Sequence, residues 1–198
     1  PYQREVIRPN MVKTFEDMVQ AVTTSWCMIH HLDNSESFGP NSKKGMEWRE
    51  TINENHAREL LELHTVSPRA GYTQEDVIQL AYIMTGWCHK WNNKDLETAD
   101  IWFDQEMHQK GDKVVLGKKY KNDAKRELAK VIHDLATHPM CIKFVSTKLC
   151  RHFITDEPTE EMINPVIEAW NKSNGNLIEI HKAVITQAFK YNDTSHKF

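Results

Sequence analysis

The sequence has few glycines and prolines, and it has no long basic run and no long apolar run. Its 198 residues include only 7 glycines and 7 prolines, which excludes a low-complexity or collagen-like chain. No run of lysine and arginine exceeds two residues and the net charge is −3, so the basic stripe of a nucleic-acid binder is missing. No stretch approaches the roughly 18 apolar residues of a membrane-spanning helix. We therefore expect a globular domain with no nucleic-acid partner and no transmembrane segment.

Cysteine is scarce as well. Its four positions are Cys27, Cys88, Cys141 and Cys150, and no two of them form the Cys-x-x-Cys pair of a structural zinc site. Cys141 and Cys150 fall on one expected helix, where nine residues separate them by roughly 13 Å, beyond disulfide reach. We expect buried free thiols. A bridge between Cys27 and Cys88 stays open as an alternative.

Helical periodicity is the strongest positive signal. Apolar residues recur at steps of three and four over residues 11–31, 123–137 and 139–153, which predicts three amphipathic helices, the third with Pro139 in its first turn. Another helix is expected after Asp156, with a kink or a division into two pieces at Pro165. The last should run from Asn176, with Glu179 at the capping-box position, to about Tyr191.

Two capping patterns predict further helices. In Thr51-x-x-Glu54 and Thr73-x-x-Asp76 the hydroxyl and the carboxylate are spaced to satisfy free backbone donors at a helix start. The patterns predict helices over 51–65 and 73–86, the second ended by Gly86.

The helical period fails over 87–117, the most aromatic part of the chain. Residues 101–103 and 114–116 favour a short β-hairpin across 110–112, with an irregular aromatic-rich insertion as the alternative. The fold class that follows is all-α: an irregular bundle of six to seven helices with this one insertion, in a single helical domain over 1–198.

The segment 53–64 is the richest in polar and titratable side chains. On a helix, Glu54, Arg58 and Glu62 form a row at spacing four, which is typical of surface ion pairs. His56 and His64 instead project into the apolar side, where each is expected either to be a core histidine bonded to a carbonyl or carboxylate, or to act as a ligand or proton carrier. His56 and Glu59 could share a metal, but two ligands make an incomplete site. The sequence thus identifies no metal and no cofactor.

Several motifs occur together in a fixed order along the chain. They are Asn53-Glu54-Asn55-x-Ala57-Arg58-Glu59-Leu60-Leu61-Glu62-Leu63-His64-Thr65, Gly71-Tyr72-Thr73-x-x-Asp76-Val77, Thr85-Gly86-Trp87, Phe103 with His108, Gly111-x-Lys113-x-x-Leu116-Gly117 and Lys148-Leu149-x-Arg151-x-Phe153. With these motifs the chain resembles, over nearly its whole length, the large bacterial domain-of-unknown-function family numbered eighteen hundred.

The resemblance implies a setting but no reaction. It implies a mostly helical bacterial protein, often exported and therefore periplasmic or secreted, whose genes often neighbour those of a sulfatase-like partner. Members of the family usually have a further N-terminal portion with a Phe-Trp-x-x-His motif, so we expect this chain to be the C-terminal portion of a longer protein.

Three functions are compatible with these residues, and the sequence does not decide whether the protein is an enzyme. The first is a binding or accessory domain that acts with an exported partner, since exposed tryptophans suit a carbohydrate or protein surface. Its expected binding residues are Asn55, Arg58, Tyr72, Asp76, Lys113, Trp87 and Trp102.

The second function is an acid–base or metal-assisted hydrolase. Glu59 would serve as the base, and His64 or His108 as proton carrier or ligand, with Arg58 or Lys113 stabilising an anion. This role requires the helix 53–64 and the loop around His108 to meet in one cleft. The third function is purely structural, with Arg58 and Glu59 tying the helix to segment 71–87 through a buried polar network.

Overall fold

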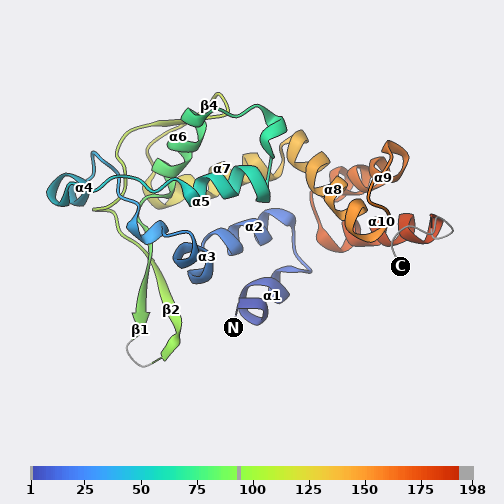
Figure 1. The fold of residues 1–198 in the computed structure, drawn as a ribbon, viewed down its shortest axis with the longest axis horizontal. Helices are drawn as coiled ribbons and strands as arrows, with labels where there is room; N and C mark the ends of the chain where they lie inside the picture. The colour runs from blue at the N-terminus through green and yellow to red at the C-terminus, as the bar shows by residue number, and fades with distance from the viewer. Residues whose placement is uncertain (1, 93–94, 192–198) are drawn as a thin grey trace.

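The computed structural model describes the backbone of residues 2–92 and 95–191, and the side chains of these residues outside 91–100. The described chain is mostly helical, with two short pairs of antiparallel strands (Figure 1). The prediction of a mostly helical fold is therefore confirmed. The described structure has two strand pairs, however, where the sequence predicts a single short hairpin or insertion.

The N-terminal part consists of short helices instead of one long one. A π-helical turn Gln3–Ile7 and α1 (Arg8–Asn10) precede α2 (Phe15–Thr23) and α3 (Trp26–His31). The predicted continuous helix over 11–31 is thus wrong. The hydroxyls of Thr24 and Ser25 donate to backbone carbonyls one turn back, and Ser25 also accepts from the amide of Met28, which starts the new helix.

The middle of the chain alternates loops and helices. Its elements are the 3-10 turn Asn34–Glu36, α4 (Lys43–Trp48), α5 (Asn55–Glu59), the π-helical turn Leu60–His64, the 3-10 turn Pro68–Ala70 and α6 (Gln74–Met84). Thr73 and Asp76 form the predicted capping box. The predicted cap at Thr51 is wrong, because α5 begins four residues later. There the Thr51 carbonyl accepts from Phe38 N and the Asn53 amide donates to Ser37 Oγ, which keeps this stretch against the 37–38 loop.

The strands pair locally. Strand β1 (Trp87–Asn92) lies antiparallel to β2 (Asp95–Phe103), and β3 (Lys113–Val115) to β4 (Lys118–Tyr120). The predicted pairing of 101–103 with 114–116 is therefore wrong, although both segments contain strand residues. Leu116 and Gly117 have φ values of 49° and 74°, and two positive values in a two-residue loop favour a tight hairpin between β3 and β4.

The C-terminal helices agree best with the sequence. The 3-10 turn Ala124–Arg126 leads to α7 (Glu127–Ala136), α8 (Pro139–Phe153), α9 (Glu160–Ser173) and α10 (Leu177–Lys190). Pro139 begins α8 and Asn176 caps α10 as predicted. Helix α9 continues through Pro165, so its predicted division is wrong. Pro165 leaves the carbonyl of Glu161 without its helical donor.

Two large apolar clusters form most of the core, beside a small third cluster of Phe38, Cys88 and Met107. One joins α5, α6, α7 and β3, and the other joins α8, α9 and α10, which gather at one end of the molecule (Figure 1). Phe15 of α2 and Val145 of α8 pack against both clusters.

Two absences that the sequence predicts can be checked within the described chain. The four cysteines are all free thiols, and Cys88, Cys141 and Cys150 are buried. The alternative bridge between Cys27 and Cys88 is thus not formed. Among the residues with described structure, no helix has both the length and the apolar character that crossing a bilayer requires.

Candidate functional site

His108 lies in a buried polar cluster with Lys113 and Glu127. Its Nδ1 is 2.8 Å from the carbonyl oxygen of Thr85, and since a carbonyl only accepts, Nδ1 carries the hydrogen. Its Nε2 is then the acceptor for the Lys113 ammonium at 3.2 Å. Lys113 Nζ also donates to the carbonyl of Gln109 at 2.7 Å and lies 2.8 Å from Glu127 Oε2. The Lys113 ammonium thus has two hydrogen bonds and one ion pair within the protein.

Glu127, which the sequence analysis missed, holds this cluster to α7. Its Oε1 accepts from the backbone amides of Asp123 and Ala124 at 2.7 and 3.1 Å. Burial tends to raise the pKa of Glu127, but the Lys113 ammonium and the hydrogen bond from the Asp123 amide outweigh burial and hold the pKa below its usual value. His108, Lys113 and Glu127 are at most 3% exposed, so no ligand in solvent reaches them without a rearrangement. The cluster serves to fasten the loop after β2 onto α7.

A second group of predicted residues forms a partly exposed network on α5 and α6. Arg58 pairs with Glu54 and donates to Gln74 Oε1 at 2.9 Å, and Asp76 accepts from the Leu116 amide at 2.7 Å. The Tyr72 hydroxyl is 3.5 Å from a Glu62 oxygen. These contacts fix α5 against α6 and the hairpin, but they are partly exposed and do not include Glu59, whereas the structural alternative predicted a buried network of Arg58 and Glu59.

The remaining predicted binding residues do not share one surface. Asn55 is exposed and its amide donates to Asn53 Oδ1. Trp87 is buried against Phe103, with ring centroids 5.7 Å apart. Trp102 is 37% exposed, with the ammonium of Lys90 3.8 Å from its ring centroid. The structure thus leaves one of the two tryptophans available to a ligand.

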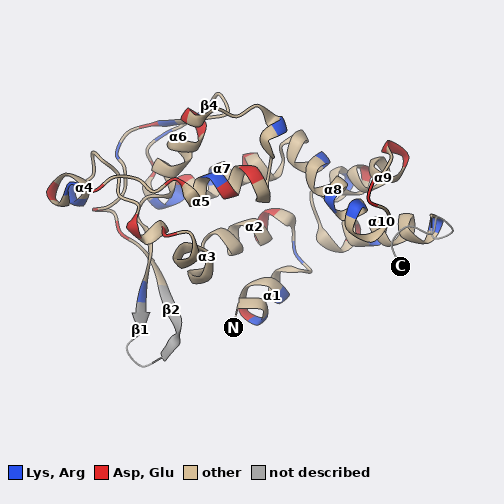
Figure 2. Ribbon diagram, viewed as in Figure 1, with Lys and Arg blue, Asp and Glu red and all other residues tan. Residues whose placement is uncertain are grey.

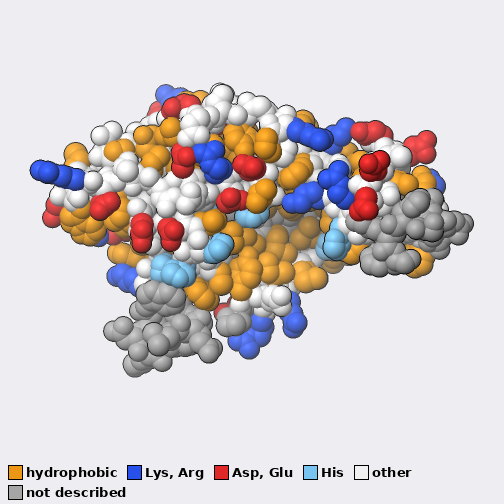
Figure 3. Space-filling model, in the orientation of Figure 1, with side chains coloured by type: hydrophobic (Ala, Val, Ile, Leu, Met, Phe, Trp, Pro, Cys, Tyr) orange, Lys and Arg blue, Asp and Glu red, His pale blue; other side chains and the backbone are white. Residues whose placement is uncertain are grey.

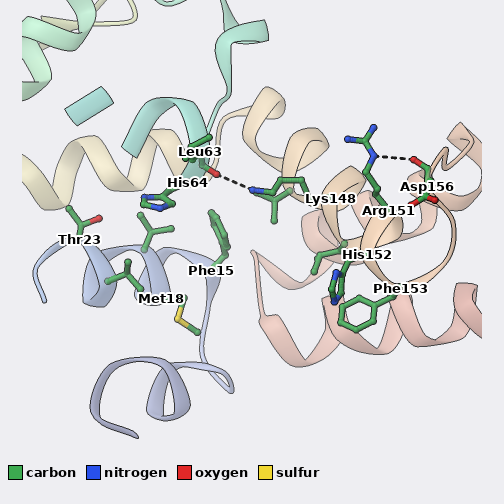
Figure 4. A pocket seen from close by; sticks show the side chains of 14 residues that line it. Phe15, Met18, Thr23, Leu63, His64, Lys148, Arg151, His152, Phe153 and Asp156 are labelled. Atoms are coloured by element: carbon green, nitrogen blue, oxygen red, sulfur yellow. Dashed lines mark hydrogen bonds between the residues drawn. The ribbon is translucent and has the colours of Figure 1, made fainter. Parts of the chain in front are cut away.

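A groove lies between α2, the π-helical turn and α8 (Figure 4). Its volume is about 730 Å³, within the usual range of small-molecule sites. On the face shown in Figure 3, hydrophobic side chains gather around it. The residues that line it are Phe15, Met18, Val19, Val22, Thr23, Leu63, His64, Val145, Lys148, Leu149, Arg151, His152, Phe153 and Asp156.

His64 is the predicted catalytic residue that lines this groove, and an irregular helix end puts it there. After α5 the chain changes to a π-helical turn, and the Thr65 hydroxyl donates to the Leu60 carbonyl at 2.6 Å. Ser67 follows with a φ of 64°, which is strained for a residue with a side chain. Irregular turns and strained residues of this kind concentrate at functional sites.

The groove carries more positive than negative charge. Helix α8 contains no aspartate or glutamate and contributes Lys148 and Arg151, and the basic residues along it are visible in Figure 2. The Lys148 ammonium donates to the Leu63 carbonyl at 3.2 Å, which holds it beside His64, and Arg151 Nε donates to the Asp156 carbonyl at 3.1 Å (Figure 4). Among the described residues, one carboxylate lines the groove, that of Asp156.

Electrostatics keep His64 uncharged in this groove. Burial is the main cause that lowers the pKa of His64; the carboxylate of Glu59 opposes it and the ammonium of Lys148 reinforces it. Glu59 therefore acts on His64 through its field, although it does not line the groove. His108 contributes nothing to the lining, so the structure brings Glu59 and His64 together but places His108 in the separate buried cluster.

In the part of the chain that the structure describes, His56 lacks the hydrogen-bond partner, a carbonyl or a carboxylate, that we expect for an ordinary core histidine. It is 1% exposed, and within the described chain neither ring nitrogen has a hydrogen-bond partner. Burial and, second, repulsion from His64 lower its pKa to about 3. The carbonyl or carboxylate partner that the sequence led us to expect is thus missing. In the same described residues no three metal-ligating side chains meet, so His56 and Glu59 are not completed to a metal site.

Comparison with known proteins gives one match. The model of a family described as Protein of unknown function (DUF1800) matches residues 1–198. No curated protein and no solved structure matches the chain.

Proposed function

The chain belongs to the family Protein of unknown function (DUF1800), and on that premise we propose that it is a binding protein for an anionic amphiphile. The ligand would have an apolar body, held in the groove between α2 and α8, and an anionic head group. The observation that carries the proposal is a groove with an apolar floor whose charged lining residues are two cations, Lys148 and Arg151, and one carboxylate, Asp156.

The apolar part of the groove supports a ligand with a hydrocarbon body. Met18 and Val22 of α2 face Val145 and Leu149 of α8 across it. Each buried methylene contributes about 0.8 kcal/mol, so a chain of eight to ten carbons contributes about 6 to 8 kcal/mol. After a cost of association of about 4 kcal/mol or more, the chain alone supplies at most about millimolar affinity, and the head group must add to it.

The cationic wall supports an anionic head group. Lys148 uses one donor on the Leu63 carbonyl, which leaves two ammonium hydrogens for a ligand. His152 lines the groove beside it and is exposed. A cationic or uncharged head group would gain less from this wall.

The wider setting follows from the resemblance alone. An exported sulfatase-like protein is the partner that the resemblance implies, and a binding protein of this kind would be its accessory. A hydrolase built on Glu59, His64 and His108 has less support, because both ring nitrogens of His108 are occupied by Thr85 and Lys113.

Calorimetric titration with three ligands of equal chain length tests the proposal. We expect decanoate to bind at one site, and decan-1-ol and decyltrimethylammonium to bind at least about tenfold more weakly, which corresponds to about 1.4 kcal/mol for the head group. Equal affinity for all three would contradict an anion-selective groove, and no binding of decanoate would overturn the proposed function.

Two variants locate the binding. Val22→Trp fills the groove, and Lys148→Ala removes the ammonium group; each should weaken decanoate binding by about tenfold or more. The matched controls are Val114→Trp on β3, where Val114 is 45% exposed, and Lys110→Ala in an exposed loop. The proposal fails if the groove variants, folded as judged by circular dichroism, bind decanoate as the controls do.

A further inference from the structure

We propose that the groove takes up a proton together with its anionic ligand, and that His64 is the residue that receives it. The inference rests on the proposed function and deepens it, because it makes the protein a pH-dependent carrier. It would hold its ligand more tightly in an acidic medium and release it as the pH rises.

The geometry of the wall supports this role for His64. Its ring lies in the groove beside α2 (Figure 4), and the Leu63 carbonyl next to it in sequence fixes the ammonium of Lys148 at 3.2 Å. An anionic head group that contacts Lys148 therefore lies close to the imidazole as well. The anion accepts a hydrogen bond from His64 only if the ring nitrogen that faces it carries a hydrogen, and an imidazolium carries a hydrogen on both nitrogens.

The charges around His64 set the direction of the change. His64 faces Glu59 and His56 of α5 and Lys148 of α8. The other titratable residues that line the groove are Arg151, His152 and Asp156, and the lining residues of α2 carry no charge. In the empty groove burial keeps the pKa of His64 low, and Lys148 adds to this effect. A bound anion reverses the local field, so protonation becomes favourable on binding.

His56 provides the second half of the arrangement. It lies near enough to His64 for the two imidazoles to repel each other when charged, yet it is buried and neither of its nitrogens has a partner within the described chain. Buried polar groups without partners are rare and call for a specific reason. Because His56 stays neutral, it places no positive charge on the protein side of His64 that would oppose protonation of His64.

The experiment is a proton-linkage titration with decane-1-sulfonate, whose head group stays charged between pH 6 and 9. Calorimetry at pH 7 in phosphate and in Tris buffer gives the number of protons bound with the ligand. We expect the wild type to take up about 0.3 to 1 proton, and its Kd to rise with pH by at most about tenfold per unit, the limit for one linked proton.

Variants assign the proton to a residue. In His64→Gln the uptake should fall to near zero and the Kd should lose its pH dependence. The matched control is His133→Gln, an exposed histidine on α7 that pairs with Glu16 outside the groove, and it should keep the uptake of the wild type. Resonances of the His64 ring should also move toward those of the imidazolium form when the ligand is added.

The possible outcomes separate this inference from the function on which it rests. Binding of decane-1-sulfonate and decanoate without proton uptake, or with uptake that persists in His64→Gln, overturns the inference and leaves the binding function standing. If neither ligand binds, the proposed function falls, and the inference falls with it.

Discussion

Two buried polar side chains, Lys113 and His56, show opposite environments at the scale of single residues. The Lys113 ammonium donates to Gln109 and His108 and forms an ion pair with Glu127. His56 is equally buried and has no hydrogen-bond partner within the described residues. An unpartnered polar group in the interior costs about 1–3 kcal/mol, so His56 is a local source of instability, whereas Lys113 is part of a satisfied cluster.

Replacing His56 should therefore stabilise the protein, most of all in acid. The folded-state pKa of His56 is about 3, below its ordinary value of 6.5, so the unfolded chain binds the proton first. The stability that neutral His56 supports is complete above pH 6.5 and is lost as the pH falls from there toward 3. We expect His56→Leu to raise the free energy of unfolding by about 1–3 kcal/mol at neutral pH and to reduce its loss in acid.

Urea denaturation at pH 7.5, 6 and 4.5 measures this effect. The control is His152→Leu, which changes an exposed histidine. If the free energies of the wild type and His56→Leu decline in parallel as the pH falls, His56 has a partner in solution that the geometry does not provide.

At the scale of elements, caps decide where the helices begin. The signals at Thr73, Pro139 and Asn176 are confirmed, because these caps depend on residues within one turn. The signal at Thr51 is wrong, because the backbone of residues 51–53 bonds to the distant 37–38 loop. The division of 11–31 into α2 and α3 could not be predicted in the same way, since the apolar period continues across the hydroxyls of Thr24 and Ser25 that interrupt the helix. The pairing of β3 with β4 depended on the conformation of Leu116 and Gly117, which hydrophobic pattern alone does not reveal.

Asp76 caps α6 and also connects this helix to the β3–β4 hairpin. Its Oδ2 accepts from Thr73, while its Oδ1 accepts from the Leu116 amide in the β3–β4 hairpin. We expect Thr73→Ala to lower the free energy of unfolding by about 1 kcal/mol, the usual value of an N-cap. Asp76→Ala should lower it by about 2 kcal/mol, because it also leaves the hairpin amide without its acceptor.

Thermal or urea unfolding of the two variants at pH 7 measures these differences. The hydrogen bonds hold the pKa of Asp76 below its usual value, so its contribution is present above the unfolded-state pKa and lost as the pH falls through the folded-state pKa. Equal losses for Thr73→Ala and Asp76→Ala would show that the bond to Leu116 contributes nothing.

At the scale of the whole molecule, the groove is made by helices that are far apart in the sequence. Phe15 of α2 and Val145 of α8 each pack against both apolar clusters and line the groove as well. The sequence placed His64 on an apolar helix face, and the motif that includes Lys148 and Arg151 contributed to the family resemblance. The sequence could not show that His64, Lys148 and Arg151 line one groove, because an amphipathic stripe specifies that a helix face is buried but not which helix covers that face.

For the same reason, the structure brings together only two of the three predicted catalytic residues. Glu59 and His64 share one short helical segment, so their proximity follows from local geometry. The expected meeting with His108 required a long-range arrangement, and the loop after β2 instead turns His108 toward Thr85 and α7. Glu127, the residue that completes this second cluster, carried no signal that set it apart from a surface glutamate at a helix start.

The most direct test of the account is to locate a bound amphiphile on the folded protein by NMR. Titration of the isotope-labelled chain with decanoate should shift the resonances of groove residues such as Val22, His64 and Leu149, and leave those of His108 and Lys113 unchanged. Saturable shifts centred on the His108 cluster or on Trp102, with the groove unaffected, would contradict the assignment of the groove as the binding site.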